Sequence, residues 1–496
     1  MRTFFEKVAD LARRAPDRRV FSDADGTLTR AGLMGDAARL VAALPAAARV
    51  IGLLLPNGRA WAVAQIACVA SGRIAVPLPA FFSPAQIAHI VRDAGIELVL
   101  VPPGGHGAAP QGLARHPVAV TGASGPAPAF QDGYGTLIYT SGSTGTPKGV
   151  RHDSGQVGWS AAALAAAIGA GPTDSYLSVL PLSLLLESIC AVFVPALVGG
   201  HAHFATGLAE AVGRGAAAGI AAAFDTHQPT VSVVVPELLR VWLGELSGGG
   251  RRAPQSLRFV AAGGAPVPPR LAAAAWRAGI PVHEGYGLSE CGSVVALNRP
   301  GARAAGTVGL PLPGLSVSIR DGEILVDGPS VTDGYAGRPG AARPWPTGDL
   351  GGFDAAGRLF VSGRKDNLIV TALGRNVSPE WVETAILDDP GITACAVGAD
   401  QGWLVALVVP APAALAGFRD ADPQARAHRI ASLCANLPPH ARPQHVVVVD
   451  LATAGACGLF TDNGRIRRAV AATLIARAAP VPVPFPSPDQ MEPAKP

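Results

Sequence analysis

The sequence predicts a large α/β protein, with an N-terminal region of two α/β subdomains and a small β subdomain, followed by a smaller, mobile α+β C-terminal domain. Three observations support this fold class. The chain has 496 residues, which is long for a single core. Hydrophobic residues make up 49% and charged residues only 15%, so several cores can be buried and a disordered protein is excluded. Short apolar runs alternate with segments of helical periodicity, a pattern typical of parallel sheets covered by helices.

The alternation begins near residue 49. Two segments have the periodicity of helices, 60–72 and 83–95, and in the second Ser83 is placed to cap a helix that has Pro84 at its first position. Three apolar runs beside these helices predict buried strands, at 49–56, 74–79 and 96–102. The following segment, 102–128, is rich in Gly, Pro and Ala and predicts a surface loop.

A second alternating region spans residues 154–296. It contains apolar runs at 230–236 and 256–264 that predict two further strands. From 309 to 326 the pattern changes to short strands separated by Pro and Gly turns, which predicts the small β subdomain.

The domain boundaries follow from changes in composition. After GRKDN at 363–367 the chain continues as a smaller α/β unit that ends near Ala479. The last residues carry seven prolines and have no periodicity, which is typical of disorder. We therefore predict an N-terminal domain over 1–364, a mobile C-terminal domain over 365–479 and a disordered, Pro-rich tail over 480–496.

Charge and cysteine usage restrict the class of partner and the compartment. The 40 Lys+Arg nearly balance the 36 Asp+Glu and form no basic stripe, so we expect no nucleic-acid partner. Six scattered cysteines without a CxxC pair indicate a reducing cytosol, and we expect a cytoplasmic protein. The most hydrophobic window, 182–200, contains Glu187, Ser188 and Pro195, which favours a buried helix beside a ligand pocket over a membrane span.

The segment TLIYTSGSTGTPKGV at 136–150 carries the strongest functional signal. An apolar strand leads directly into a loop of Ser, Thr and Gly residues with one lysine, Lys148. Glycines let backbone N–H groups approach a phosphate chain, hydroxyls add donors, and the lysine adds positive charge. A flexible linker needs neither the strand nor Lys148. The segment therefore predicts a phosphate-binding loop, although it lacks the Walker pattern.

The sequence here resembles the adenylate-forming, AMP-binding enzymes, and it is most similar to acyl-CoA synthetases of the long-chain fatty acid–CoA ligase type. Further matches follow in the family's order over roughly residues 20–470. The resemblance implies that the phosphate loop binds ATP. The implied contacts in this loop come from Thr140, Ser141, Gly142, Ser143, Thr144, Gly145 and Lys148.

Two further motifs imply the adenine and metal contacts. By resemblance, the turn of SLRFVAAGGAPVPPRL at 256–271 lies against adenine through Gly264, Ala265 and Pro266. In VHEGYGLSECG at 282–292 the resemblance places Glu284 at the adenine amino group, Tyr286 against the ring, Ser289 on the α-phosphate and Glu290 on Mg²⁺. Gly285 and Gly287 belong to the same ATP-binding stretch. A carboxylate is the oxygen ligand that Mg²⁺ prefers.

The resemblance also assigns residues to the ribose, the hinge and the second substrate. Asp349 in WPTGDLG is implied to bind both ribose hydroxyls, for which a carboxylate is suited because it accepts two hydrogen bonds. Arg364 is expected near the ribose, and Asp366 matches the hinge between the domains. Gly374 and Arg375, in the loop TALGRNVSPEWVE, are implied to contact CoA.

The sequence departs from the family pattern at two positions. Arg465 stands in TDNGRIRR where relatives carry a catalytic Lys. Because guanidinium is a planar fork, this change is not neutral. Arg465 can replace Lys with some loss of rate, which the chain's four lysines favour, or it can suit an unusual acid, or it can mark a weak enzyme. The second departure is Leu184, which stands where many relatives have a His or an aromatic residue.

Together these observations predict an enzyme that uses ATP, Mg²⁺ and CoA. A fatty or aryl acid is expected to form an acyl-adenylate with release of pyrophosphate, and CoA then takes the acyl group. Lys148, Ser289, Glu290 and Arg465 are the predicted catalytic residues, and Leu184, Leu185 and Leu288 are expected to line the acid pocket. Three alternatives stay open: transfer to a carrier protein or amine, activation of a non-carboxylic acid such as nitrite, and a nucleotide-binding protein without catalysis.

Overall fold

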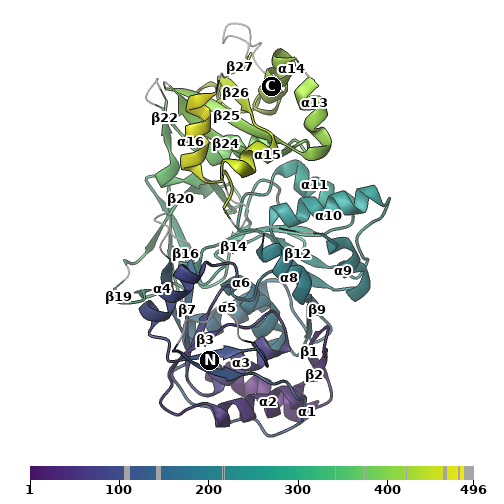
Figure 1. Ribbon diagram of the computed structural model, residues 1–496, viewed down its shortest axis with the longest axis vertical. Coiled ribbons are helices and arrows are strands. Elements are labelled where there is room, and N and C mark those ends of the chain that lie inside the picture. The colour runs from purple at the N-terminus through teal and green to yellow at the C-terminus, as the bar shows by residue number, and fades with distance from the viewer. Residues whose placement is uncertain are drawn as a thin grey trace.

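The computed structural model describes residues 1–105, 112–140, 147–214, 216, 218–340, 342–371, 375–400, 402–420, 422–461, 466–478 and 481–484. The molecule is elongated, with the C-terminal domain at one end and helices α1 (Arg2–Arg14) and α2 (Arg30–Ala43) at the other (Figure 1). The predicted fold class is confirmed: a large mixed α/β region is followed by a smaller domain. In the part of the chain that the structure describes, no helix combines the length and hydrophobicity needed to cross a membrane.

The first α/β subdomain contains an eight-stranded sheet in the order β19-β18-β8-β7-β4-β3-β5-β6. Its strands are β3 (Val50–Leu53), β4 (Ile74–Pro77), β5 (Leu98–Val101), β6 (Ala114–Pro117), β7 (Gly135–Thr140), β8 (Lys148–Asp153), β18 (Gly334–Tyr335) and β19 (Arg338–Pro339). Strands β7, β4, β3, β5 and β6 are parallel, as the alternation predicts. Helices α3 (Arg59–Ala70), α4 (Pro84–Ala94) and α5 (Ser154–Ala167) follow strands of this sheet.

Two local features of this subdomain bear on the sequence predictions. The cap of α4 is confirmed, because Ser83 and Gln86 form a reciprocal capping box. The prediction that 102–128 is only a surface loop is wrong at Ala114–Pro117, which forms β6 beside β5. These residues, ARHP, show no strand signal because they are largely exposed and hold an edge position.

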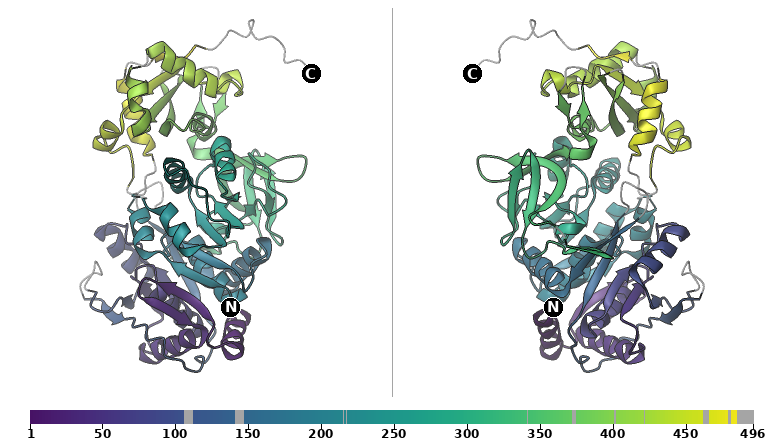
Figure 2. Two further views of the ribbon diagram at one scale, coloured as in Figure 1. Left: turned by 90° about the vertical axis from the view of Figure 1, so that its right-hand side faces the viewer. Right: turned by 90° about the vertical axis from the view of Figure 1, so that its left-hand side faces the viewer.

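The second α/β subdomain contains a nine-stranded sheet in the order β15-β14-β13-β12-β11-β9-β10-β1-β2. Its strands are β1 (Arg19–Asp23), β2 (Gly26–Thr29), β9 (Ser175–Ser178), β10 (His201–Phe204), β11 (Val231–Val234), β12 (Phe259–Ala262), β13 (Val282–Tyr286), β14 (Ala296–Leu297) and β15 (Leu310–Pro311). The helices that connect its central strands are α8 (Thr206–Gly213), α9 (Ile220–His227), α10 (Pro236–Gly248) and α11 (Pro269–Arg277). Figure 2 shows the two sheets and their helices from two sides.

A small β subdomain joins these units to the C-terminal domain. Its strands β16 (Ser316–Arg320), β17 (Glu323–Asp327), β20 (Trp345–Phe353) and β21 (Leu359–Arg364) form an antiparallel sheet. The last strand ends at Arg364, the residue at which the sequence places the domain boundary.

The C-terminal domain is built on the sheet β24-β25-β26-β27, which has helices on both faces. Its strands are β24 (Ile392–Asp400), β25 (Trp403–Pro410), β26 (His445–Val448) and β27 (Val481–Pro482), with the hairpin β22 (Ile369–Val370) and β23 (Asn376–Val377) beside them. Its helices are α12 (Pro379–Ile386), α13 (Leu415–Asp420), α14 (Pro423–Leu433), α15 (Leu451–Ala456) and α16 (Arg468–Arg477).

The predicted start of a disordered tail at residue 480 is too early. Val481 pairs with Val446 of β26, and the side chain of Val483 is buried in the domain core. The alternating Val and Pro residues suit an edge strand, where Pro removes no ladder hydrogen bond. Residues 485–496 lie outside the described part of the chain.

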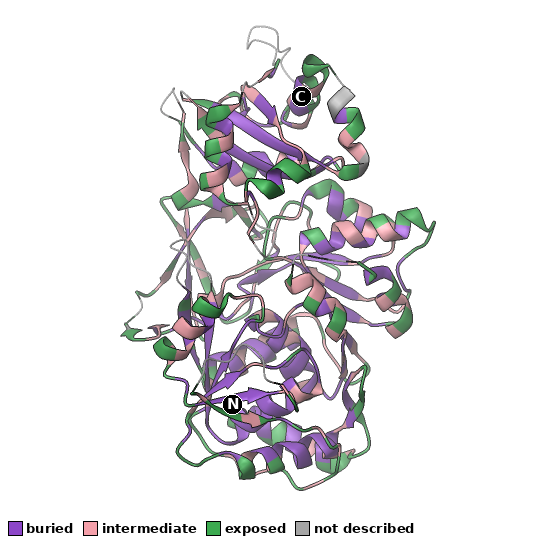
Figure 3. Ribbon diagram, in the orientation of Figure 1, coloured by how far each residue is buried: buried purple, intermediate pink, exposed green. Residues whose placement is uncertain are grey.

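The buried residues follow this division of the molecule (Figure 3). One large apolar cluster extends through both α/β subdomains, and separate clusters fill the β subdomain and the two faces of the C-terminal sheet. The segment 182–200 forms a helical unit inside the large cluster, made of α6 (Leu185–Ser188), the π-helix η1 (Ile189–Phe193) and α7 (Val194–Val198). The prediction of a buried helix beside a ligand pocket is therefore confirmed.

Candidate active site

A cavity of about 500 Å³ lies among the strands and loops named by the sequence motifs. Strands β11, β12 and β13 end at it, as expected for a ligand site at the carboxyl ends of parallel strands. Its polar part is lined by Thr140, Tyr286, Ser289, Glu290 and Arg364. Its apolar part includes the predicted pocket residues Leu184, Leu185 and Leu288. Residues that are far apart in the chain are thus brought to one cavity.

Tyr286, Asp349 and Arg364 form a hydrogen-bonded chain beside this cavity. The Tyr286 hydroxyl donates to Oδ2 of Asp349 at 2.6 Å, and Nη1 of Arg364 donates to Oδ1 of the same carboxylate at 2.9 Å. Burial raises the pKa of the Tyr286 phenol, and the nearby charge of Asp349 raises it further, so Tyr286 stays a donor. The aromatic residue and the carboxylate expected at adenine and ribose therefore lie side by side.

Ser289 and Glu290 lie in a short 3-10 helix, η2 (Ser289–Cys291), directly after β13. Nε2 of His152 donates to the carbonyl oxygen of Ser289 at 2.7 Å. Burial lowers the pKa of His152 to about 4, so its imidazole is neutral at pH 7 and its Nε2–H serves as the donor. On the other side, the Thr332 amide donates to the Glu290 carbonyl at 2.8 Å. The backbone carbonyls of Ser289 and Glu290 are thus both fixed.

In the described part of the chain, the Glu290 carboxylate has one direct side-chain partner. The Tyr335 hydroxyl donates to its Oε1 at 3.0 Å, and Glu290 itself lines the cavity. Among the residues that the structure describes, no group of three or more His, Cys, Asp or Glu side chains is arranged to hold a metal ion. A site with one carboxylate fits Mg²⁺ that takes its other ligands from phosphates and water, which is how Mg²⁺ is often bound in nucleotide sites.

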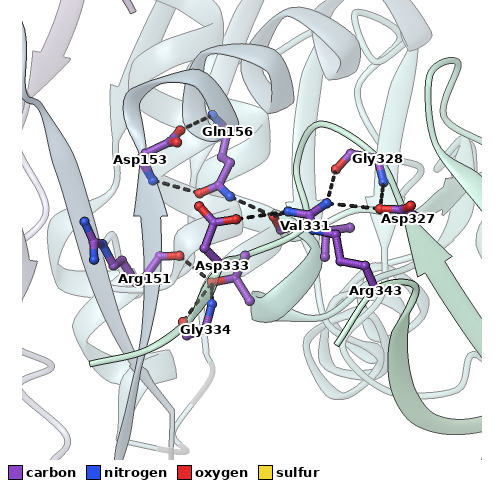
Figure 4. Close-up of polar contacts among 10 residues, drawn as sticks. Arg151, Asp153, Gln156, Asp327, Gly328, Val331, Asp333, Gly334 and Arg343 are labelled. Atoms are coloured by element: carbon purple, nitrogen blue, oxygen red, sulfur yellow. Dashed lines mark hydrogen bonds and ion pairs between the residues drawn. The ribbon is translucent and has the colours of Figure 1, made fainter. Parts of the chain in front are cut away.

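A polar network holds the loop that leads from Val331 to β18 against β8 and α5, and Figure 4 shows its part from Val331 to Gly334. Gln156 of α5 donates to the Val331 carbonyl at 2.7 Å, and the Thr332 hydroxyl donates to the Arg151 carbonyl at 2.5 Å. Arg343 binds the other side of the loop through the Val331 carbonyl, at 2.9 Å. Because β8 begins at Lys148, this network ties the phosphate-loop strand to the residues around Glu290.

Two glycines of the motifs are required by the backbone, Gly287 by a close approach and Gly264 by a left-handed conformation. A Cβ atom at Gly287 would lie 1.8 Å from the carbonyl oxygen of Ser293, so no other residue fits there without backbone movement. Gly264 lines the cavity with a φ of +80°, in the left-handed region that favours glycine. Gly285 also lines the cavity, whereas Ala265 and Pro266 are exposed and lie outside the lining.

Glu284 has surroundings that the motif does not predict. Its carboxylate is buried and pairs with Arg303, whose Nη2 and Nε lie 2.7 and 3.1 Å from its two oxygens. Asn298 donates to the same carboxylate at 3.3 Å. Glu284 is also absent from the cavity lining. Its side chain is therefore committed to Arg303, and the predicted contact with the adenine amino group finds no support in this arrangement.

The helical unit 182–200 supplies a polar group that the sequence motifs do not single out. Glu187 is fully buried and lines the cavity, and its Oε2 accepts a hydrogen bond from the Tyr176 hydroxyl at 2.9 Å. Burial raises the pKa of Glu187 to about 8. A charged residue inside an otherwise apolar sequence window is the signal that could have identified it.

The remaining predicted site residues fall into two groups. Lys148, Asp366 and Arg375 are exposed: Lys148 begins β8, Asp366 lies in the 3-10 helix η3 (Lys365–Asn367) after β21, and Arg375 precedes β23. The others lie outside the described residues, namely Ser141, Gly142, Ser143, Thr144, Gly145, Gly374 and Arg465.

The C-terminal domain contacts the second α/β subdomain through the end of α12. Arg240 of α10 donates to the Leu387 carbonyl at 2.9 Å. The amide of Arg270 donates to Oδ1 of Asp388 at 2.6 Å, and its Nε lies 3.1 Å from Oδ2. These contacts hold the two domains in the orientation seen in Figure 1.

Comparisons with known proteins agree with this geometry. The profile of the AMP-binding enzyme family matches residues 8–336. A sulfoacetate–CoA ligase of Cupriavidus necator is 30% identical over 460 residues, which cover 83% of this chain and 87% of that protein. A 2-succinylbenzoate–CoA ligase of Geobacillus kaustophilus is 32% identical over 280 residues, which cover 52% of this chain and 54% of that ligase, so the chain matches about half of its length.

A solved structure extends the likeness over most of the chain. The O-succinylbenzoate coenzyme A synthetase of Bacillus subtilis in complex with AMP superposes with a TM-score of 0.76 and 25% identity, covering 93% of this chain and 97% of that one. The same synthetase has been solved with ATP and a magnesium ion. The chain therefore belongs to the AMP-binding enzyme family.

Proposed function

We propose that this protein is an AMP-forming acid–CoA ligase that activates an organic acid with ATP. The observation that carries the proposal is that one cavity is lined both by Tyr286, Ser289, Glu290 and Arg364 and by the apolar residues around Leu184–Leu186. A nucleotide phosphate and the carboxylate of an apolar acid can meet inside such a cavity. The family match and the CoA ligases among the relatives support the same activity.

In the proposed first step a carboxylate oxygen of the acid attacks the α-phosphorus of ATP, and the bond to the pyrophosphate oxygen breaks. In the second step the CoA sulfur attacks the acyl carbon and AMP leaves. In this proposal Asp349 and Arg364 orient the ribose, and the Ser289 hydroxyl donates to the α-phosphate. Glu290 would hold Mg²⁺, which neutralises phosphate charge when bound. The chain contributes mainly positioning and charge complementarity.

The cavity also restricts the acid. Its volume of about 500 Å³ is far more than nitrite needs, and its lining is largely aliphatic and aromatic. These properties support an organic acid with an apolar skeleton, in keeping with the predicted fatty or aryl acid. We further propose that the enzyme works in the cytoplasm, which is supported by six free cysteines.

Pyrophosphate release tests the proposal. The protein, Mg·ATP and a panel of aliphatic and aryl acids are incubated without an acceptor, and CoA is added in a second series with mass spectrometry of the thioester. We expect release with at least one acid and a CoA thioester in the second series. Glu290→Ala is expected to lose release while keeping the fold, and Arg465→Lys tests whether Arg465 is a competent substitute for Lys. If no acid gives pyrophosphate release while ATP still binds, the proposal is contradicted.

The second series also separates the possible acceptors. If pyrophosphate is released but no thioester forms with CoA, transfer to a carrier protein or an amine replaces CoA in the proposal.

A further inference from the structure

Glu187 is an ionisable side chain in the wall of the acid pocket that the proposed chemistry does not use. It lies on α6, its exposed fraction is 0%, and it lines the cavity together with Leu185, Cys190 and Val233. The hydrogen bond from the Tyr176 hydroxyl to Oε2 anchors one side of the carboxyl group.

The second oxygen of this carboxyl group is free. Oε1 has no hydrogen-bond partner among the described residues. The Ser178 hydroxyl and the Leu180 amide lie close enough to lower the pKa of Glu187, but burial outweighs them and raises it to about 8. At pH 7 most of the carboxyl groups are therefore protonated.

The position of the proton follows from the Tyr176 contact. Because Oε2 already accepts the Tyr176 hydrogen, the proton of the neutral acid belongs on Oε1, which makes no hydrogen bond to a described residue in this structure. A buried donor without a partner is costly, and such groups in native proteins call for an explanation such as a bound ligand. The neighbours of Glu187 in the cavity wall are mainly aliphatic, so the pocket wall offers this donor few hydrogen-bond acceptors.

We propose that Glu187 is a specificity residue that binds a neutral oxygen substituent, a hydroxyl or an oxo group, on the apolar skeleton of the acid. The inference rests on the proposed function, because it assumes that the acid occupies this cavity. It narrows the substrate class from fatty or aryl acids in general to those that carry one such oxygen away from the reacting carboxylate. An oxo oxygen accepts from Oε1–H, and a hydroxyl can both accept and donate.

A matched set of acids and variants tests this inference. The acids are decanoate, decanoates with a hydroxyl or oxo group at successive carbons, and the pair 4-phenylbutanoate and 4-oxo-4-phenylbutanoate, with amino-substituted acids as a third class. Each is assayed for binding by calorimetry and for kcat/KM of pyrophosphate release. The variants are Glu187→Gln, which keeps shape and a donor, Glu187→Leu, which removes both, and Tyr176→Phe, which removes the anchor but keeps Glu187.

We expect the wild type to prefer at least one oxygen-substituted acid over its plain partner by roughly tenfold in binding and in kcat/KM. Glu187→Gln should keep most of this preference, and Glu187→Leu should abolish it while binding the plain acid at least as well. Tyr176→Phe should keep the preference in part. A thermal melt and ATP binding identify any variant that fails to fold. If Glu187→Leu or Tyr176→Phe fails to fold, Glu187→Gln alone tests the inference.

Other results overturn the inference. The inference is contradicted if the wild type binds plain and substituted acids equally. It is also contradicted if Glu187→Leu loses the same affinity for both kinds of acid, or if the wild type prefers amino-substituted acids. Failure of the proposed function looks different: no acid then gives pyrophosphate, whatever the binding preference shows.

Discussion

The hydroxyl of Tyr286 and the carboxylate of Asp349 lie 2.6 Å apart although 63 residues separate them in the chain. The contact links β13 of the second α/β subdomain to β20 of the β subdomain. Arg364, at the end of β21, binds the other carboxylate oxygen. The residues assigned to adenine and ribose are therefore preorganised by one another, across a junction between two structural units.

This relationship predicts a specific loss of nucleotide binding. Asp349→Ala removes the acceptor for both partners and for the proposed ribose hydroxyls, and we expect ATP to bind at least tenfold more weakly, since hydrogen bonds to charged groups contribute about 1.5–3 kcal/mol. Calorimetric titration with ATP measures the effect. Asp354→Ala is the matched control, because Asp354 pairs with Arg358 at 2.7 Å in the turn of the same hairpin, outside the cavity lining. Equal losses in both variants would contradict the assignment.

Leu184 predicts the apolar character of the acid. Its side chain is 38% exposed and lines the cavity, at the position where many relatives carry His or an aromatic residue. Leu184→Ala removes apolar contact area, so the KM for an apolar acid should rise about fivefold, which corresponds to about 1 kcal/mol. The free energy of unfolding should change little. Leu310→Ala is the control, since Leu310 is 36% exposed on β15 and outside the cavity lining. An unchanged KM in Leu184→Ala would remove this residue from the acid pocket.

Local signals predicted much of the fold. The cap at Ser83 and the apolar run that forms Val231–Val234 each depend on neighbours in sequence, and both are seen in the structure. The edge strands β6 and β27 could not be predicted in this way, because their pairing is set by strands far away in the chain and their own residues are exposed or rich in Pro.

The candidate site shows the same limit. The motifs name Glu290, Asp349 and Tyr286, but they predict neither the hydrogen bond between Tyr286 and Asp349 nor the one from Tyr335 to Glu290, because these contacts arise only from tertiary packing. Glu284 is the clearest case: its place in the motif suggests adenine, while its ion pair with Arg303 follows from a loop that no local pattern connects to it. Residue type and spacing predict which groups are present, and packing decides which of them are free to meet a ligand.

His152 predicts how stability changes with pH. Its pKa is about 4 in the folded protein and about 6.5 in an unfolded chain, so between these values the unfolded state binds more protons. The free energy of unfolding should therefore rise with pH over this window, by about 3 kcal/mol from this residue. His152→Gln keeps a donor for the Ser289 carbonyl and removes the titration. Urea unfolding at several pH values measures the difference between wild type and variant.

Subtracting the pH profile of the unfolding free energy of His152→Gln from that of the wild type isolates the contribution of His152 from those of the other titrating groups. His201 and His203 also have pKa values lowered to about 4 and act in the same direction in both proteins. Glu187 acts in the opposite direction, because its raised pKa of about 8 makes the folded state bind more protons above about pH 4.5. A constant difference between wild type and His152→Gln from pH 4 to 7 would show that His152 does not titrate as the structure requires.

The contact between the domains predicts that the two half-reactions respond differently to one substitution. Asp388 binds the amide and the guanidinium of Arg270. We propose that the C-terminal domain rotates about the hinge predicted at Asp366 between the two half-reactions, and these bonds would then break. Asp388→Ala should therefore destabilise the orientation of the C-terminal domain seen in this structure and leave its other orientations unaffected. The guanidinium of Arg270 is exposed, so we expect a modest effect of about 1 kcal/mol or less, equivalent to a two- to fivefold slower formation of the acyl-adenylate. The rate of CoA transfer from preformed acyl-adenylate should be unchanged or faster.

Single-turnover kinetics of the separate steps measures this split. Arg251→Ala is the matched control, because Arg251 forms an exposed ion pair of 2.7 Å with Asp225 within one subdomain and should affect neither step. If Asp388→Ala slows both steps by the same factor, the contact stabilises the domain as a whole and does not select an orientation. A split in the expected direction would instead assign the orientation in Figure 1 to the adenylate-forming step, because only that step would then depend on the Arg270–Asp388 contact.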